Sequence, residues 1–262
     1  VLDEMGQGEM TLHLPSVQPN EHISVVAVEV QGKPVVYESP EITISADTFV
    51  HTLKVTLSVG SEDLDIRYST NGNTQLQTYR KPFEIDTTTT IFAQSYDGDQ
   101  AVSKIVSKAV TKTAPRSADE LQANVHGKLS LSVYEGDWDE LPNFSLLTPT
   151  ERTTDSSFSI PEREFVARVY TGFIYAPSTD MYMFALSSDD GSRFSIGDDV
   201  VIDNDGLHGA QVVQGAIALA QGWHACKVEW FNKTGGGSLG LNMGVVGEPL
   251  IAIPSASLSM AK

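Results

Sequence analysis

The chain has 262 residues, of which 40% are hydrophobic, and this length is enough for more than one domain with a sizeable core. Its 34 acidic and 17 basic residues give a formal charge of -17, which argues against nucleic acid and anionic membrane surfaces as partners, because binding phosphate needs basic patches. No stretch approaches the roughly 18 apolar residues of a membrane-spanning helix, so we expect no membrane span.

The single cysteine, Cys226, excludes an intramolecular disulfide bond. It alternates with Val228 and Trp230, a pattern that predicts a buried thiol on the inward face of a strand. The sequence begins at Val1 without an initiator methionine or a signal peptide, and we therefore expect a fragment of a longer protein.

Almost all of the chain has the pattern of β-strands. Hydrophobic and polar residues alternate over 23–30, 53–59 and 90–96, and clusters of Gly, Pro, Asn or Asp bound each run. Breaks at 37–40 and 112–116 divide the chain, which predicts an all-β fold of tandem β-sandwiches. The three predicted segments are 1–37, 38–113 and 114–262.

Residues 1–37 are too short to form a domain. A Leu-His-Leu-Pro phrase at 12–15 is followed by a valine-rich run at 25–36 that contains Gly-Lys-Pro. These features resemble the closing strands of the β-sandwich behind the barrel of bacterial alpha-L-fucosidases, a family of glycoside hydrolases. The resemblance implies a parent enzyme with its own catalytic domain. Any other pair of antiparallel strands is the alternative.

Residues 38–113 contain Ile-Arg-Tyr-Ser-Thr-Asn-Gly at 66–72, Tyr-Arg-Lys-Pro-Phe at 79–83 and a threonine run at 87–90. This succession resembles the small immunoglobulin-like or fibronectin-like module at the C-terminal end of chitobiases and hexosaminidases. The resemblance implies a spacer. We expect its tyrosines to pack in the core, with sugar contact as the alternative.

In residues 114–262, the run Ser-Ser-Asp-Asp-Gly-Ser at 187–192 is followed by Val-Val-Ile-Asp-Asn-Asp-Gly-Leu-His-Gly at 200–209. Asp-Gly and Asn-Asp-Gly form hairpin turns in many proteins, so ordinary turn chemistry is one explanation. Paired carboxylates at a loop tip also suit calcium or sugar hydroxyls.

The order of motifs over about 118–254, which includes Thr-Gly at 171–172 and Gly-Trp-His at 222–224, resembles the β-sandwich module first described in anthrax protective antigen. In sugar-binding members, notably yeast flocculins and epithelial adhesins, an aspartate pair joined by a cis peptide bond holds calcium, and the ion coordinates a terminal sugar. The resemblance implies that Asp189 and Asp190 form this pair.

The adhesins complete the site with an asparagine and a further acidic residue from a later loop. Here that loop offers Asn232 but no carboxylate, and Lys233 would repel a cation. The implied metal ligands are Asp189, Asp190 and Asn232, with calcium as the cofactor. The alternative is that the aspartate pair only braces its loop.

Two more residues are candidates for contact with sugar. His208 follows the Asp-Gly turn, and we expect it to form hydrogen bonds within its own loop, with sugar contact as the alternative. Trp138 lies in a polar loop at 135–140, where an exposed indole would stack on a pyranose ring.

No catalytic residues are predicted. A glycosidase needs two carboxylates that face each other across about 5 to 10 Å, and neighbouring side chains on a strand point to opposite faces. The chain lacks Gly-x-Ser-x-Gly, His-Glu-x-x-His and phosphate-binding glycine loops, and its six histidines show no metal-ligand spacing.

The sequence thus predicts a non-catalytic, carbohydrate-binding accessory region of a secreted glycoside hydrolase that resembles an alpha-L-fucosidase or a hexosaminidase. Its expected partners are glycans or terminal sugars and the parent's catalytic domain. Its expected location is secreted, periplasmic or on the surface of a bacterium. The alternatives are a structural spacer or oligomerisation tail without sugar binding, and a free-standing adhesin.

Overall fold

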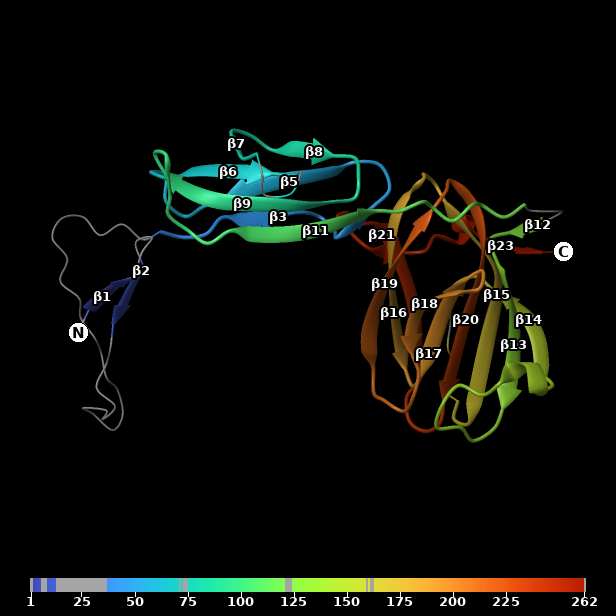
Figure 1. Ribbon diagram of the computed structural model, residues 1–262. Coiled ribbons are helices and arrows are strands. Elements are labelled where there is room, and N and C mark those ends of the chain that lie inside the picture. Colours follow the sequence, from blue (N-terminus) through green and yellow to red (C-terminus); the bar gives the residue numbers. More distant parts are fainter. Residues whose placement is uncertain are drawn as a thin grey trace, which may run out of the picture. The chain divides into compact units, whose positions relative to one another are not determined.

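The computed structural model describes residues 2–5, 9–12, 37–70, 72, 75–120, 124–158, 160 and 163–261. The chain forms two compact units (Figure 1). The small unit comprises Val1–Asp47 and Thr52–Thr111, and the large unit comprises Thr48–His51 and Lys112–Lys262. None of the helices in the described part could cross a membrane.

The predicted closing strands of a preceding sandwich fall largely outside the described residues. Within 1–37, the structure describes one antiparallel hairpin of β1 (Leu2–Met5) and β2 (Glu9–Leu12). The resemblance of this segment to fucosidases stays a prediction.

The small unit contains two sheets. In one sheet the strand order is β3–β5–β8. In the other it is β11–β9–β6–β7, and β10 also pairs with β9. The strands are β3 (Glu41–Thr43), β5 (Leu53–Ser58), β6 (Asp65–Ser69), β7 (Gln77–Thr78), β8 (Phe83–Ile85), β9 (Thr89–Asp97), β10 (Gln100–Ala101) and β11 (Val106–Lys112). The short strand β4 (Thr48–Phe49) groups with the large unit.

Alternation along these strands fills the core of the small unit, as the sequence predicts. Val55 on β5 and Ile91 on β9 are completely buried. Tyr68 is also buried, and its ring stacks on Phe83 with 4.2 Å between the ring centroids. The expected core packing is therefore confirmed for Tyr68.

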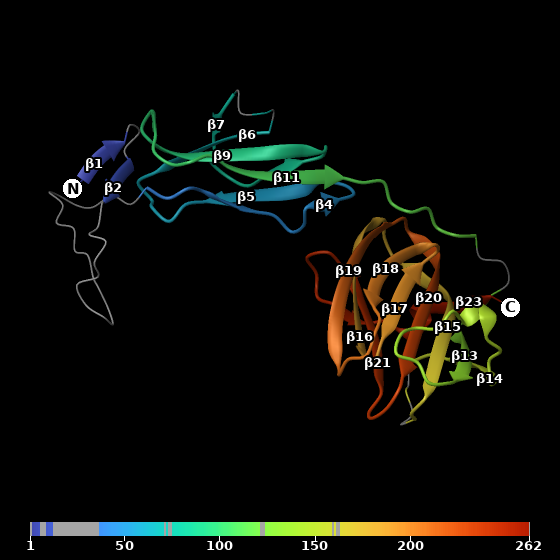
Figure 2. The same ribbon diagram turned by 60° about the horizontal axis from the view of Figure 1, so that its bottom comes forward.

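The large unit is a β-sandwich, seen from two sides in Figures 1 and 2. One sheet has the order β12–β23–β15–β20–β17–β18, with β13 also paired to β15 and β14 to β13. The other has the order β19–β16–β21–β22. Its elements are β12 (Asn124–His126), β13 (Leu129–Glu135), η1 (Phe144–Leu146), β14 (Glu151–Asp155), β15 (Val166–Ala176), β16 (Asp180–Asp189), β17 (Ser192–Ile196), β18 (Asp199–Asn204), β19 (Gln211–Leu219), β20 (Gly222–Asn232), β21 (Ser238–Val245), β22 (Ile251–Ala252), η2 (Ser255–Ser257) and β23 (Leu258–Ala261).

The side chains that face inward from the two sheets form one hydrophobic core. Val228 and Trp230 on β20 pack there with Phe184 on β16, and Trp230 is completely buried. Cys226 lies in the same row, and its burial raises the pKa of the thiol to about 12. The predicted all-β fold and the buried cysteine are both confirmed.

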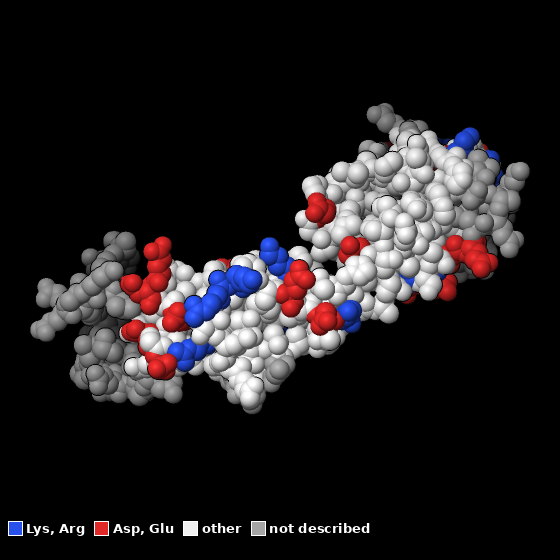
Figure 3. All heavy atoms as spheres, turned by 90° about the horizontal axis from the view of Figure 1, so that it is seen from above, with Lys and Arg blue, Asp and Glu red and all other residues white. Residues whose placement is uncertain are grey.

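The surface carries charges of both signs. On the face seen in Figure 3, acidic and basic side chains of the described residues are interspersed, and no large basic patch is visible on that face. This agrees with the low content of Lys and Arg, which is half that of Asp and Glu.

Candidate functional site

Three connections between the two sheets meet at one end of the large unit. Residues 190–191 join β16 to β17, residues 205–210 join β18 to β19, and residues 233–237 join β20 to β21. In each case the two strands belong to different sheets, so the Asp-Asp-Gly and Asn-Asp-Gly turns are not the hairpin turns that their composition also allows. We call this end the tip.

Asp190 connects the three crossovers. Its side chain is only 7% exposed, and both carboxylate oxygens accept hydrogen bonds from backbone N–H groups. Oδ1 accepts from His208 at 3.1 Å, and Oδ2 accepts from Lys233 at 3.0 Å. A buried carboxylate is tolerated only when it is hydrogen-bonded, so Asp190 holds the two neighbouring loops against its own.

Asp189 is joined to Asp190 by a cis peptide bond, as the resemblance implies. Its carbonyl oxygen accepts a hydrogen bond from the indole Nε1 of the buried Trp230 at 2.9 Å, which ties the backbone to the core. Its half-buried carboxylate forms no hydrogen bond or ion pair with any residue that the structure describes. The two adjacent carboxylates therefore have different surroundings.

Asn232 lies directly beside this pair. Phe231 donates its backbone N–H to the oxygen of Gly191 at 3.0 Å, and Lys233 donates to Asp190, so the residues on both sides of Asn232 are tied to the aspartate turn. The Asn232 side chain is completely buried, and its Nδ2 donates to the oxygen of Arg163 at 2.8 Å. Its Oδ1 is buried without a hydrogen-bond partner in the described part of the chain.

Close contacts with neighbouring residues require glycine at position 191. A Cβ atom there would lie 2.5 Å from the ring of Phe231 and 2.7 Å from the backbone nitrogen of Gly206. Such distances are too short for any side chain, so the close approach of the crossovers requires glycine.

A network of polar side chains, of which all but Gln211 are buried, lies next to the aspartate turn. Ser188 and Ser192 hydroxyls lie 2.7 Å apart, and Asn204 donates to Ser188 at 2.9 Å. Gln211 in turn donates to Asn204 at 2.6 Å. The network links β16, β17, β18 and β19 immediately beneath the aspartate pair.

The ammonium group of Lys233 forms ion pairs with two carboxylates of another loop. Its Nζ lies 2.6 Å from Asp139 and 3.1 Å from Asp137, in the loop after β13. Hydrogen bonds to Asp139 and Asp137 raise the pKa of this ammonium group. The repulsion expected from Lys233 is thus reduced by two carboxylates that the sequence did not connect with it.

His208 forms the hydrogen bonds expected within its own loop. Its ring nitrogens lie 2.9 Å from the oxygen of Gly209 and 3.0 Å from the oxygen of Asn204. Trp138 is half-buried and packs on a small apolar cluster that includes Val169 and Phe231. The roles of His208 and Trp138 in sugar binding stay predictions.

An aromatic residue at the tip was missed from the sequence. Phe165 is 40% exposed and has a φ of 54°, an uncommon backbone conformation for a bulky residue. Its backbone N–H donates to the oxygen of Lys233 at 2.9 Å, next to Asn232. Neither its spacing nor its neighbours in the sequence give a signal for this position.

The oxygen atoms at the tip suit a hard cation better than a soft one. No group of three or more His, Cys, Asp or Glu residues with metal-binding geometry occurs among the residues that the structure describes. The set at the tip is instead two carboxylates and one amide oxygen, the donor types that calcium prefers. The Oδ1 atom of Asn232, buried without a hydrogen-bond partner in the part of the chain that the structure describes, fits such an ion.

Two parts of the chain match known families. Residues 147–250 match the model of the PA14 domain. Residues 44–107 match that of the chitobiase/beta-hexosaminidase C-terminal domain. The resemblances of these two parts to the protective-antigen-type and chitobiase-type modules are confirmed. No curated protein matches the chain significantly.

Solved structures similar to the chain include the PA14 domain of the antifreeze protein MpAFP, which is 15% identical and has a TM-score of 0.46, with 56% of this chain and 96% of that one covered. The PA14 sugar-binding domain of an RTX adhesin is 13% identical, with a TM-score of 0.47 and coverage of 52% and 100%. The epithelial adhesin 9 A domain of Candida glabrata, solved in complex with Galb1-4GlcNAc, is 12% identical, with a TM-score of 0.44 and coverage of 57% and 97%.

Proposed function

We propose that the large unit binds terminal sugars through a calcium ion held at the tip by Asp189, Asp190 and Asn232. The observation that carries this proposal is the Oδ1 atom of Asn232, which is buried without a hydrogen-bond partner among the described residues, while the residues on both sides of Asn232 are hydrogen-bonded to Asp190 and Gly191. An unsatisfied buried acceptor costs about 1–3 kcal/mol, and a cation removes that cost.

The three side chains have oxygen atoms to spare. The carboxylate of Asp189 has no described partner, and each oxygen of Asp190 accepts one hydrogen bond while it has capacity for another. Calcium takes about six to eight oxygen ligands, so water and sugar hydroxyls would have to supply the others. When bound, the ion supplies a positive charge that attracts vicinal hydroxyl groups.

At the level of the whole chain, we propose an accessory region of a secreted bacterial glycoside hydrolase, in which the tip positions the enzyme on glycans. The matches to a PA14 domain and to a chitobiase/beta-hexosaminidase C-terminal domain support a region of the kind that carbohydrate-active enzymes carry. The fucosidase-like parent, its catalytic domain and its location outside the cell belong to this proposal.

A second function is favoured by the hydrogen bonds of Asp190. Because both of its oxygens hold loops together, the aspartate pair also suits a purely structural role in a spacer without sugar binding. The two functions differ at Asp189, whose carboxylate holds no described residue in place. A brace does not need that carboxylate, whereas a calcium site does.

We therefore expect Asp189→Asn to lower calcium affinity at least about tenfold without changing the stability measured in chelator, because one ligand charge is lost and no internal bond is broken. Calorimetric titration with calcium chloride and thermal unfolding with and without calcium measure the two effects. Asp86→Asn, an exposed aspartate of the small unit, is the matched control. Absence of calcium binding by the unaltered chain at millimolar concentrations would favour the structural role.

A further inference from the structure

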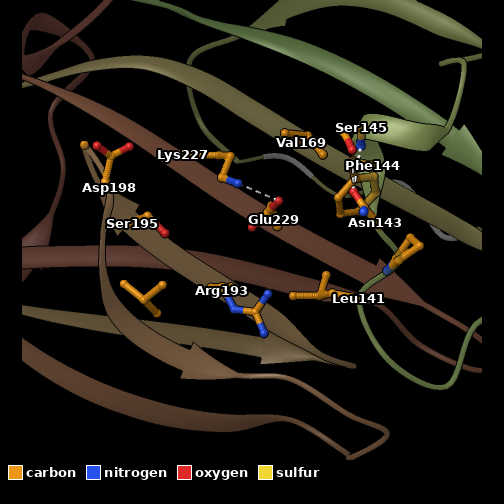
Figure 4. Close-up of a pocket in the computed structure, with 13 residues that line it drawn as sticks. Leu141, Asn143, Phe144, Ser145, Val169, Arg193, Ser195, Asp198, Lys227 and Glu229 are labelled. Carbon is orange, nitrogen blue, oxygen red and sulfur yellow. Dashed lines mark hydrogen bonds and ion pairs between the residues drawn. The ribbon is translucent and has the colours of Figure 1, made fainter.

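The large unit has a groove on the outer face of its eight-stranded sheet, on the opposite side from the core (Figure 4). Its floor is formed by side chains of the three adjacent strands β15, β20 and β17. One wall is the segment 141–145, and the other is the turn that begins at Gly197. The cavity volume is about 730 Å³, within the range of about 300–1,000 Å³ that is typical of ligand sites.

The register of the strands sets the polar groups of the floor side by side. Glu229 on β20 lies opposite Val169 on one neighbouring strand and Arg193 on the other. In the next row, Lys227 lies opposite Ser195. Side chains directly opposite in adjacent strands are close enough to act on one ligand together. Figure 4 shows Asp198 at one end of this floor and Asn143 at the other.

Glu229 is the central group of the floor. It is only 8% exposed, and its Oε1 accepts a hydrogen bond from the Lys227 Nζ at 2.9 Å. No residue in the described part of the chain donates to its Oε2. A carboxylate that is covered to this extent and only half satisfied is a strong hydrogen-bond acceptor for a ligand in the groove.

The groove is held open by fixed contacts. Asp205 accepts a hydrogen bond from the backbone N–H of Leu141 in the wall at 2.7 Å and from Arg193 in the floor at 3.3 Å. Asp203 holds the same guanidinium group at 3.2 Å. A site whose wall and floor are already tied together loses little freedom when a ligand enters.

The charges of the lining select the class of ligand. Among the lining residues, Arg193 and Lys227 are matched in number by Glu229 and Asp198. Arg193 is also paired with Asp203 and Asp205, so the groove has no excess positive charge to attract a polyanion, and the two cationic side chains in its floor disfavour a metal ion. The three floor strands are each paired on both sides, so an added peptide strand finds no free backbone groups there.

We propose that this groove is a second saccharide-binding site, which takes a segment of a neutral oligosaccharide. Sugar hydroxyls both donate and accept hydrogen bonds, and the floor offers the acceptor Glu229 together with the donors Lys227 and Ser195. Leu141 and Phe144 present apolar surface to the C–H faces of the sugar rings. None of the residues that line the groove belongs to the tip, although Asp205 of the tip supports its wall and floor, and the proposal does not rest on calcium.

Binding of the full chain to a printed array of neutral, uronic and sulfated oligosaccharides tests this, with excess chelator present to suppress the tip. We expect the neutral oligosaccharides to be bound in chelator. Glu229→Gln and Lys227→Met are each expected to weaken that binding about tenfold or more, because each removes one charged hydrogen-bonding group. Lys128→Met, which alters an exposed lysine of the same unit, is the matched control.

The tip variant Asp189→Asn is expected to keep all chelator-resistant binding, so that failure of the groove and failure of the tip are distinguishable. Circular dichroism and thermal unfolding check that every variant is folded. The proposal is overturned if no neutral oligosaccharide binds in chelator, if uronic or sulfated glycans are preferred, or if folded Glu229→Gln and Lys227→Met bind as the unaltered chain does.

Discussion

Asp190→Ala is expected to lower the free energy of unfolding of the large unit by about 2–4 kcal/mol and to abolish calcium-dependent sugar binding. The substitution removes the acceptors of two backbone N–H groups, those of His208 and Lys233, at a site that is 7% exposed. A hydrogen bond to a charged group contributes about 1.5–3 kcal/mol, and two bonds to one carboxylate are not fully additive.

Urea denaturation followed by tryptophan fluorescence measures this effect, because all three tryptophans of the chain lie in the large unit. Asp189→Asn is the informative comparison. The carboxylate of Asp189 has no described partner, so the stability of this variant in chelator should equal that of the unaltered chain. An Asp190→Ala variant as stable as the unaltered chain would mean that this carboxylate does not hold the tip together.

Trp230→Ala is expected to have the largest effect on stability, a loss of about 3–5 kcal/mol, as found for large aromatic residues removed from a core. Trp230 is completely buried, and its indole also donates to the carbonyl oxygen of Asp189. The variant therefore loses both core packing and the bond that fixes the backbone of the aspartate pair.

Denaturation followed by circular dichroism measures the loss. Trp223→Ala is the matched control, because Trp223 is half-buried beside Tyr175 on the outer face of the same strand, and its removal should cost less. If Trp230→Ala were no more costly than Trp223→Ala, the indole of Trp230 would not be the main packing element at this end of the core.

Local alternation was sufficient to predict the inward face of β20. Cys226, Val228 and Trp230 face inward from β20 as expected, because the side-chain period of a strand is two. Family resemblance added that Asn232 belongs with Asp189 and Asp190, which the structure brings to the same tip. The spacing of these three residues in the sequence would not by itself have indicated that they lie at the same tip.

The sequence could not predict contacts between segments that are far apart along the chain. Lys233 forms an ion pair with Asp139, which is 94 residues away. The prediction that Lys233 repels a cation at the tip did not include this partner. The buried Oδ1 atom of Asn232 lacks a hydrogen-bond partner among the described residues because of a side-chain orientation that no motif encodes. The groove depends on the register of β15, β20 and β17, which the sequence does not give. The sequence did contain one signal: Lys227 and Glu229 alternate with buried residues, which indicates that both side chains lie on the outer face of the sheet.

The most direct test of calcium-assisted sugar binding at the tip is a glycan array probed with the full chain in calcium and again in excess chelator. The account predicts that some glycans with terminal sugars are bound only in calcium, and that Asp189→Asn loses this part of the binding while it stays folded. The absence of any glycan whose binding requires calcium, or calcium-dependent binding that Asp189→Asn keeps in full, would contradict it.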